Sequence, residues 1–182
     1  GAALNNLGKK VLLIDLDPQA NLTQSLGLTN QQRTIYGSLK GEYKLEPIVI
    51  LKGFDIVPST LDLSGAEIEL SSEAGREFIL KELIDEVRTK YDFIIIDSPP
   101  SLGLLTINSF TAADEIIIPL QAQFLAMQGL AKLVEVVEKI KSRLNKGLKI
   151  GGVFITQYDG RKVLNRDVFE TINEHFKSEV FK

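Results

Sequence analysis

Apolar positions along the chain form two recurring patterns. Continuous apolar runs are typical of strands buried on both faces of a sheet, and they predict strands at residues 11–15, 54–58, 93–97, 115–120 and 149–156. Longer segments, with apolar residues three and four positions apart, predict helices at residues 61–70, 75–90, 102–112, 125–144 and 165–176. Strands that alternate with helices predict an α/β fold with a mostly parallel sheet flanked by helices.

The two ends of the sequence suggest an incomplete domain. The first eight residues, Gly1-Ala-Ala-Leu-Asn-Asn-Leu-Gly8, have the pattern of the last turns of a helix with a C-terminal glycine stop. Residues 176–182 end without a clear final element. We interpret residues 1–182 as a single incomplete domain that is truncated at both ends.

Composition excludes several kinds of site. The 182 residues are 44% hydrophobic and 25% charged, which is ordinary for a soluble globular protein. The chain has no cysteine, which excludes disulfides and thiolate metal sites, and one histidine, which disfavours a histidine-based triad. With no secretory leader and no apolar run of membrane-spanning length, a cytoplasmic location is expected. A net charge of −3 means that nucleic-acid binding would need a local basic patch.

Acidic residues end two of the predicted strands. Asp15 and Asp17 follow the first apolar run, and Asp97 ends the third. Ligands of open α/β sheets bind beyond these strand ends, where one carboxylate can hold magnesium and another can position a water for phosphoryl transfer. Asp15 and Asp17 share a side only if the strand continues past Leu16; otherwise they diverge. The alternative is that each aspartate only caps a turn or a helix.

Three classes of phosphoryl-transfer fold use acids in this way. The two-residue spacing of Asp15 and Asp17 fits a haloacid-dehalogenase-type phosphatase, but Pro18-Gln19 stands where that class has Gly-Thr. The 80-residue gap from Asp17 to Asp97 is too wide for a receiver domain. A P-loop ATPase accommodates the gap.

Four segments together resemble one family over the whole chain. They are Lys9-Lys-Val-Leu-Leu-Ile-Asp-Leu-Asp-Pro-Gln-Ala-Asn-Leu-Thr23, Tyr91-Asp-Phe-Ile-Ile-Ile-Asp-Ser-Pro-Pro-Ser-Leu-Gly103, Pro119-Leu-Gln-Ala-Gln123 and Gly152-Val-Phe-Ile-Thr-Gln-Tyr-Asp-Gly-Arg161. In this order they resemble the ParA/Soj partition ATPases, a deviant-Walker P-loop group that also contains MinD. The resemblance implies a P-loop NTPase-like fold, with ATP and Mg²⁺ as cofactors.

The resemblance also implies roles for the strand-end residues. Asp17 matches the aspartate that orients the hydrolytic water, and Asp15 matches the one near the phosphates and magnesium. Asp97 matches the Walker B aspartate, which holds magnesium through water. Ser98 and Pro99 match the switch II segment, which is expected to respond to the γ-phosphate.

Two further groups of candidates lie near the end of the last predicted strand. Thr156 and Gln157 are candidates for contact with the nucleotide base, and a simple turn is the alternative. Arg161, Lys162 and Arg166 are candidate DNA-binding residues, and a solvated basic loop is the alternative.

The family also implies partners. Its members form homodimers on binding ATP, bind DNA non-specifically, and act with a ParB-type adaptor protein in chromosome or plasmid segregation. We therefore expect a nucleoid-associated, cytoplasmic ATPase with no membrane partner. The alternatives are a MinD-like membrane-positioning ATPase and a non-catalytic interaction domain whose acids only cap turns.

One family motif has no counterpart here. The phosphate loop Lys-Gly-Gly-Val-Gly-Lys-Thr, expected just before Gly1, is absent, and no stretch of the 182 residues matches G-x-x-x-x-G-K-[ST]. Because that loop supplies most of the attraction for phosphates, we expect these 182 residues to bind ATP poorly. Without the strand that precedes the loop, we also expect the strand at residues 11–15 to lose a neighbour and expose an apolar edge.

Overall fold

The computed structural model describes residues 1–176, except the side chains at positions 124–128, 164 and 175. The chain divides into two compact units, one spanning Gly1–Ala112 and the other beginning at Ala113. The interpretation of residues 1–182 as one incomplete domain stays a prediction.

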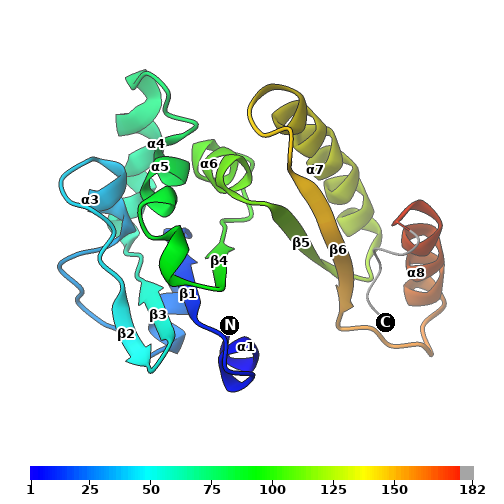
Figure 1. Ribbon diagram of the computed structural model, residues 1–182. Coiled ribbons are helices and arrows are strands. Elements are labelled where there is room, and N and C mark those ends of the chain that lie inside the picture. The colour runs from blue at the N-terminus through cyan, green and yellow to red at the C-terminus, as the bar shows by residue number, and fades with distance from the viewer. Residues whose placement is uncertain (177–182) are drawn as a thin grey trace. The chain divides into compact units, whose positions relative to one another are not determined.

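The first unit is built on a four-stranded sheet of order β2-β3-β1-β4 (Figure 1). β1 (Val11–Asp15) pairs in parallel with β3 (Phe54–Val57) on one side and with β4 (Phe93–Asp97) on the other. β2 (Ile48–Leu51) is antiparallel to β3. The strand predictions at 11–15 and 93–97 are confirmed, β3 ends one residue before the prediction, and β2 was not predicted.

The prediction that the strand at residues 11–15 exposes an apolar edge is wrong. All five residues of β1 are buried, because the strand lies between β3 and β4. Among the described residues, only β1 pairs with β4. Phe93 of β4 is 43% exposed, and the three isoleucines that follow are only partly buried. The open apolar edge of the parallel sheet therefore belongs to β4.

Short helices cover the sheet of the first unit. They are α1 (Ala2–Asn6), α2 (Asn21–Ser25), α3 (Ile35–Leu39), α4 (Ala66–Glu69), α5 (Ile79–Asp85) and α6 (Leu104–Ala112). The 3₁₀ turns η1 (Leu61–Gly65) and η2 (Leu70–Ser72) flank α4, and η3 (Arg88–Lys90) follows α5. The predicted helices at 61–70 and 75–90 are therefore broken into shorter pieces. α2 and α3 were not predicted.

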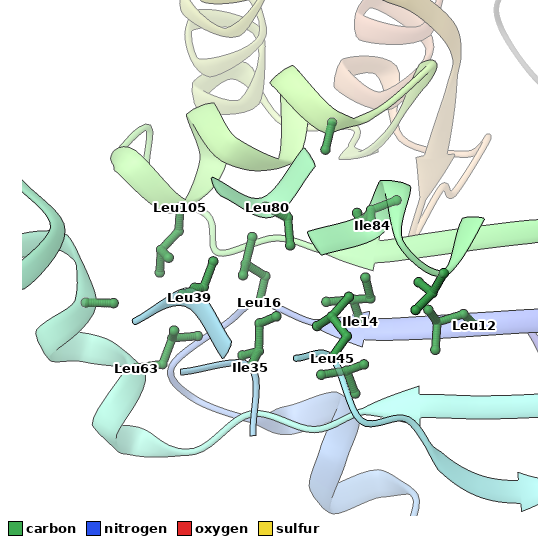
Figure 2. Packing of buried hydrophobic residues seen from close by; sticks show 14 of the residues in the cluster. Leu12, Ile14, Leu16, Ile35, Leu39, Leu45, Leu63, Leu80, Ile84 and Leu105 are labelled. Carbon is green, nitrogen blue, oxygen red and sulfur yellow. The ribbon is translucent and has the colours of Figure 1, made fainter. Parts of the chain in front are cut away.

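The side chains of β1 alternate between two apolar clusters. Leu12 and Ile14 point into the larger cluster, with Leu16 just beyond the strand and leucines from α3, α5 and α6 around them (Figure 2). Val11 and Leu13 point to the opposite face and pack with Phe54 and Ile56 of β3. This alternation follows from the two-residue period of a strand. It explains why β1 is apolar from Val11 to Ile14, and its last residue, Asp15, is the first acid.

The second unit pairs two strands in parallel. β5 (Glu115–Gln121) lies beside β6 (Lys149–Thr156), with α7 (Phe124–Arg143) between them in sequence and α8 (Val163–Phe176) after β6. These four elements confirm the predictions within one to two residues at most boundaries. On α7, Leu130, Val137 and Ile140 are buried. None of the described helices is long and apolar enough to cross a membrane.

Candidate nucleotide site at two adjacent strand ends

The sheet brings the two acidic strand ends together. β1 and β4 are parallel neighbours, and Asp15 is the register partner of Asp97. Just beyond the strand, the Leu16 N–H donates to the Asp97 carbonyl at 2.8 Å, so the two chains separate only after this point. Asp15, Asp17 and Asp97 therefore lie at the carboxyl ends of neighbouring strands of one sheet, where the sequence analysis expected ligands to bind.

Asp15 is enclosed. β1 ends at this residue and does not continue past Leu16. Asp15 and Asp17 therefore do not share one side of an extended strand. The Asp15 side chain has no exposed surface, and its Oδ2 accepts from the Thr23 N–H at 2.8 Å and from Thr23 Oγ1 at 2.6 Å. Its Oδ1 accepts from the Asp17 N–H at 3.2 Å. A phosphatase nucleophile needs an accessible oxygen, so this burial argues against the dehalogenase-type alternative.

Asp15 also acts as a helix cap. The N-cap residue of α2 is Ala20, which has no side-chain acceptor for the first N–H groups of the helix. The carboxylate of Asp15 accepts from the third helical residue instead. The capping role that we gave as the alternative for a strand-end aspartate is therefore present at Asp15.

Asp17 lies in the turn between β1 and α2 and is only partly buried. Its Oδ1 accepts from the Gln19 N–H at 2.9 Å, which closes a local turn through Pro18. Its carbonyl accepts from the Ala20 N–H at 2.9 Å and from Ser59 Oγ at 2.8 Å. The Asp17 backbone is thus held from several sides while its carboxylate stays in reach of solvent.

Asp97 is the exposed member of the group. Partial burial raises the pKa of its carboxyl, and the negative charges of Asp15 and then Asp17 raise that pKa further. Asp97 itself lines a cavity of about 370 Å³, whose other side chains are apolar and come from α1, β1, β3, β4 and the α2 segment. The exposed Asp97 carboxylate, next to the charges of Asp15 and Asp17, is therefore a place where a cation would relieve repulsion.

The loop after Asp97 is tethered to the elements around it. Ser98 Oγ donates to Ser109 Oγ at 3.0 Å, and Thr106 Oγ1 donates to the Ser101 carbonyl at 2.5 Å. Pro99 is buried. Glu67 of α4 accepts from the Leu105 N–H at 3.3 Å and so caps α6 from outside the loop.

Asn108 anchors α6 behind this loop. Its side chain is buried; it donates to the carbonyls of Arg76 at 2.8 Å and Leu104 at 3.1 Å. Its Oδ1 accepts from the Leu80 N–H at 3.0 Å, near the start of α5. The candidate switch residues Ser98 and Pro99 therefore rest on a scaffold of side-chain hydrogen bonds.

The remaining candidates belong to the second unit. Thr156 Oγ1 donates weakly to the Leu120 carbonyl at 3.4 Å, and Gln157 adopts a left-handed backbone conformation with φ of 54°. Asn165 accepts from the Asp159 N–H at 2.9 Å and donates to the Ala122 carbonyl at 2.7 Å. This buried asparagine joins the loops that follow β5 and β6.

The three basic candidates differ in their surroundings. The Arg161 guanidinium pairs with the Asp159 carboxylate at 2.9 Å, which lowers the pKa of Asp159. Lys162 and Arg166 are exposed. Part of the charge of Arg161 is therefore already balanced by a local turn.

The sequence is similar to one domain family and to several named proteins. The AAA domain family matches residues 1–150. The chromosome-partitioning ATPase Soj of Treponema pallidum is 42% identical, over the whole chain and 72% of that protein. The sporulation initiation inhibitor protein Soj of Bacillus subtilis is 41% identical, over the whole chain and 74% of that protein. The chain belongs to the Soj/ParA family of partition ATPases.

Solved structures confirm the P-loop ATPase fold expected of a Soj/ParA protein. Cobyrinic acid a,c-diamide synthase from Mycobacterium smegmatis, crystallised with ADP and magnesium, superposes with a TM-score of 0.90 at 37% identity, over 97% of this chain and 74% of that one. A plasmid partition protein from Borrelia burgdorferi superposes with a TM-score of 0.84 at 30% identity, over 98% and 78%.

The residues of this Soj/ParA chain fit one part of a magnesium site. Among the described residues, no group of three or more acidic or histidine side chains is arranged to hold a metal ion. Magnesium does not need such a cage, because it keeps several waters and binds through one or two carboxylates together with phosphates. The exposed Asp97, crowded by two other acids, matches that requirement.

Sequence reasoning missed Thr23, Ser59 and Asn165. Each has a buried polar side chain that joins segments distant in the chain. Thr23 stands inside the family-like motif at residues 9–23, but its partner became evident only once the path of the turn was known. Nothing in the local sequence around Ser59 or Asn165 indicates its partner.

Proposed function

We propose that the complete protein hydrolyses ATP with Mg²⁺ and uses that reaction to partition DNA. The observation that carries the proposal is the register of Asp15 with Asp97 at adjacent strand ends of a Soj/ParA chain, with Asp17 in the turn just after β1 and close enough for its charge to act on Asp97. In the reaction, a water oxygen bonds to the γ-phosphorus while the bond from that phosphorus to the β,γ-bridging oxygen breaks. ADP leaves, and the proton of the water passes to solvent or phosphate.

Each acid has a distinct part in this proposal. The Asp97 carboxylate accepts hydrogen bonds from waters at the strand end. Partial burial, and then the charges of Asp15 and Asp17, raise its pKa, and the nearby negative charge favours a cation. The Asp17 carboxylate accepts a hydrogen bond from the attacking water and orients it. Bound magnesium would neutralise phosphate charge. Ser98 and Pro99 would transmit the presence of the γ-phosphate to α6 through Ser109 and Thr106.

The direct test is ATP hydrolysis by the complete protein. We expect Asp17→Ala to lower kcat by about 100-fold while nucleotide binding persists, because positioning of the nucleophile contributes on that order. Asp97→Asn should raise the magnesium concentration needed for activity. Asp62→Asn, a change at an exposed acid in η1, is the matched control and should have no effect. An inactive wild-type protein would favour the non-catalytic interaction domain.

We propose further that ATP binding drives homodimerisation, non-specific DNA binding and work with a ParB-type adaptor, which would place the protein on the nucleoid. Lys162 and Arg166 are exposed cations that support a DNA contact, and Arg161 contributes less because Asp159 pairs with it. Lys162→Glu with Arg166→Glu should weaken DNA binding and flatten its dependence on salt. Lys139→Glu in α7, where the lysine pairs with Glu135, is the control. Unchanged binding by the double variant would contradict the DNA contact.

We also propose, from the same family resemblance, that Thr156 and Gln157 contact the nucleotide base. The test of this contact is the preference for ATP over GTP, which Gln157→Ala should reduce.

For the 182-residue chain alone we propose weak ATP binding, because it contains no glycine-rich phosphate loop and three carboxylates repel phosphates. Micromolar affinity in a titration of this chain with Mg–ATP would contradict that.

A further inference from the structure

A closed set of hydrogen bonds surrounds the turn that carries Asp17. Asp15 Oδ2 accepts from Thr23 Oγ1 at 2.6 Å, and Thr23 Oγ1 accepts in turn from the Ser59 N–H at 2.9 Å. Ser59 Oγ donates to the Asp17 carbonyl at 2.8 Å. The Asp17 N–H donates back to Asp15 Oδ1 at 3.2 Å, which completes the ring.

Three of the four residues in the ring are buried, and the fourth, Asp17, is partly buried. Asp15 is fully buried, and Thr23 and Ser59 are 3% and 2% exposed. Hydrogen bonds to a carboxylate are stronger than neutral ones, and with little water to compete they stay formed. Three segments are joined in this way: the end of β1, the short helix α2, and the loop that follows β3.

The ring fixes both backbone polar groups of Asp17, its N–H and its carbonyl. The N–H of Asp17 is held by Asp15 and its carbonyl by Ser59, while its carboxylate stays outside the ring, with Oδ1 bonded to the Gln19 N–H. A reacting group displaced by about 1 Å loses on the order of 100-fold in rate. Two buried residues, Asp15 and Ser59, therefore hold the backbone that carries the Asp17 carboxylate in place.

We propose that Thr23 and Ser59 are positioning residues for Asp17, with Asp15 as the acceptor on which they are assembled. The inference rests on the proposed role of Asp17 in ATP hydrolysis. It assigns Asp15 a part in orienting the turn, which its burial permits. It also links the loop after β3 to the site, since Ser59 is the only described side chain that donates to the Asp17 carbonyl.

The test uses Thr23→Val, which keeps the shape of the side chain but removes its hydroxyl, in the complete protein. We expect kcat for ATP hydrolysis to fall about 10-fold or more with KM changed less than about twofold, because positioning and not binding is lost. In the nucleotide-free protein, the amide of Asp17 should exchange with deuterium faster. Thr23→Ser keeps the hydroxyl and should restore both values to within about twofold.

Two more variants keep the test decisive if Thr23→Val does not fold. Ser59→Ala removes only the bond to the Asp17 carbonyl and should lower kcat several-fold, in the direction expected for weaker positioning. Ser38→Ala removes a buried hydroxyl that donates to the Lys44 carbonyl and should change neither kcat nor Asp17 exchange.

The outcomes separate the two claims. If Asp17→Ala abolishes hydrolysis while Thr23→Val and Ser59→Ala match Ser38→Ala, the positioning inference is overturned. If Asp17→Ala leaves hydrolysis unchanged, the proposed role of Asp17 fails, and the positioning inference fails with it. Loss of kcat without faster Asp17 exchange would also contradict the inference.

Discussion

The ends of β1 and β4 carry aspartates in register with each other, yet the two side chains have opposite environments. Asp15 is fully buried and receives three hydrogen bonds from Thr23 and Asp17. Asp97 is exposed, next to other negative charges, with a raised pKa. Asp15 is enclosed because Thr23 of α2 donates to its carboxylate and Ser59, after β3, donates to Thr23, while no group among the described residues donates a hydrogen bond to the Asp97 carboxylate. An acid at a closed strand end organises the chain, and an acid at an open one is available to a ligand.

The strongest way to break this comparison is to remove the buried carboxylate. Asp15→Ala leaves three donors without an acceptor, and an unsatisfied buried donor costs about 1–3 kcal/mol, so we expect a loss of about 4 kcal/mol in the free energy of unfolding. Urea unfolding measures it. Asp97→Ala is the matched variant at the open end and should not lower stability. Equal losses at both positions would show that the two strand ends do not differ.

A second change tests the support behind the open end. Asn108→Ala removes the acceptor of the Leu80 N–H and the donor to two carbonyls, so we expect a loss of about 2–3 kcal/mol in the same measurement. Hydrogen exchange should also increase at the start of α5. A loss below about 0.5 kcal/mol would mean that solvent replaces these bonds.

A third change tests the cap on α6. A Cβ atom at Gly103 would lie 2.0 Å from Glu67 Oε1, so Gly103→Ala must displace the Glu67 side chain from the Leu105 N–H. Loss of such a cap costs about 1 kcal/mol. Gly103→Ala and Glu67→Ala remove the same hydrogen bond, from the Leu105 N–H to Glu67. In a Glu67→Ala background, Gly103→Ala should therefore lower the free energy of unfolding by little more. Additive losses would contradict this mechanism.

The smallest expected effect has the opposite sign. The folded pKa of Asp97 is raised, so the wild-type chain loses stability as the pH rises through that value. Asp97→Asn should therefore be more stable at pH 7 without magnesium, by about 0.5 kcal/mol after screening by solvent. The gain should vanish as the pH falls toward the unfolded value of 3.8. Unfolding curves for both chains at several pH values measure it, and a loss at pH 7 would be contrary to the account.

The sequence predicted every strand except β2, together with the aspartates that end β1 and β4, because both are local patterns. Apolar runs of strand length and their terminal aspartates are visible residue by residue, and parallel strands bring their ends together. The short helices were missed or mis-sized because their caps are not local. α2 is capped by Asp15 from the preceding strand, α5 by Asn108 and α6 by Glu67, 28 and 38 residues away from the N–H groups they accept from.

The open edge was misassigned for a related reason. The apolar run at 11–15 is as consistent with an edge-adjacent strand as with a central one, because both faces are covered in either case. Strand order depends on pairings between segments far apart in sequence, here β1 with β3 and β4. The Thr23–Ser59 hydrogen bond could not be predicted for the same reason, because its partners are 36 positions apart.

The most direct test of the difference between the two strand ends is the magnesium dependence of ATP hydrolysis in the complete protein. Asp97→Asn and Asp15→Asn are compared at saturating ATP. We predict that Asp97→Asn raises the half-saturating Mg²⁺ concentration about 10-fold or more, as for loss of a magnesium-binding carboxylate. Asp15→Asn should lower kcat while leaving that concentration within about twofold of wild type. A shift in magnesium dependence for Asp15→Asn, with none for Asp97→Asn, would contradict the account.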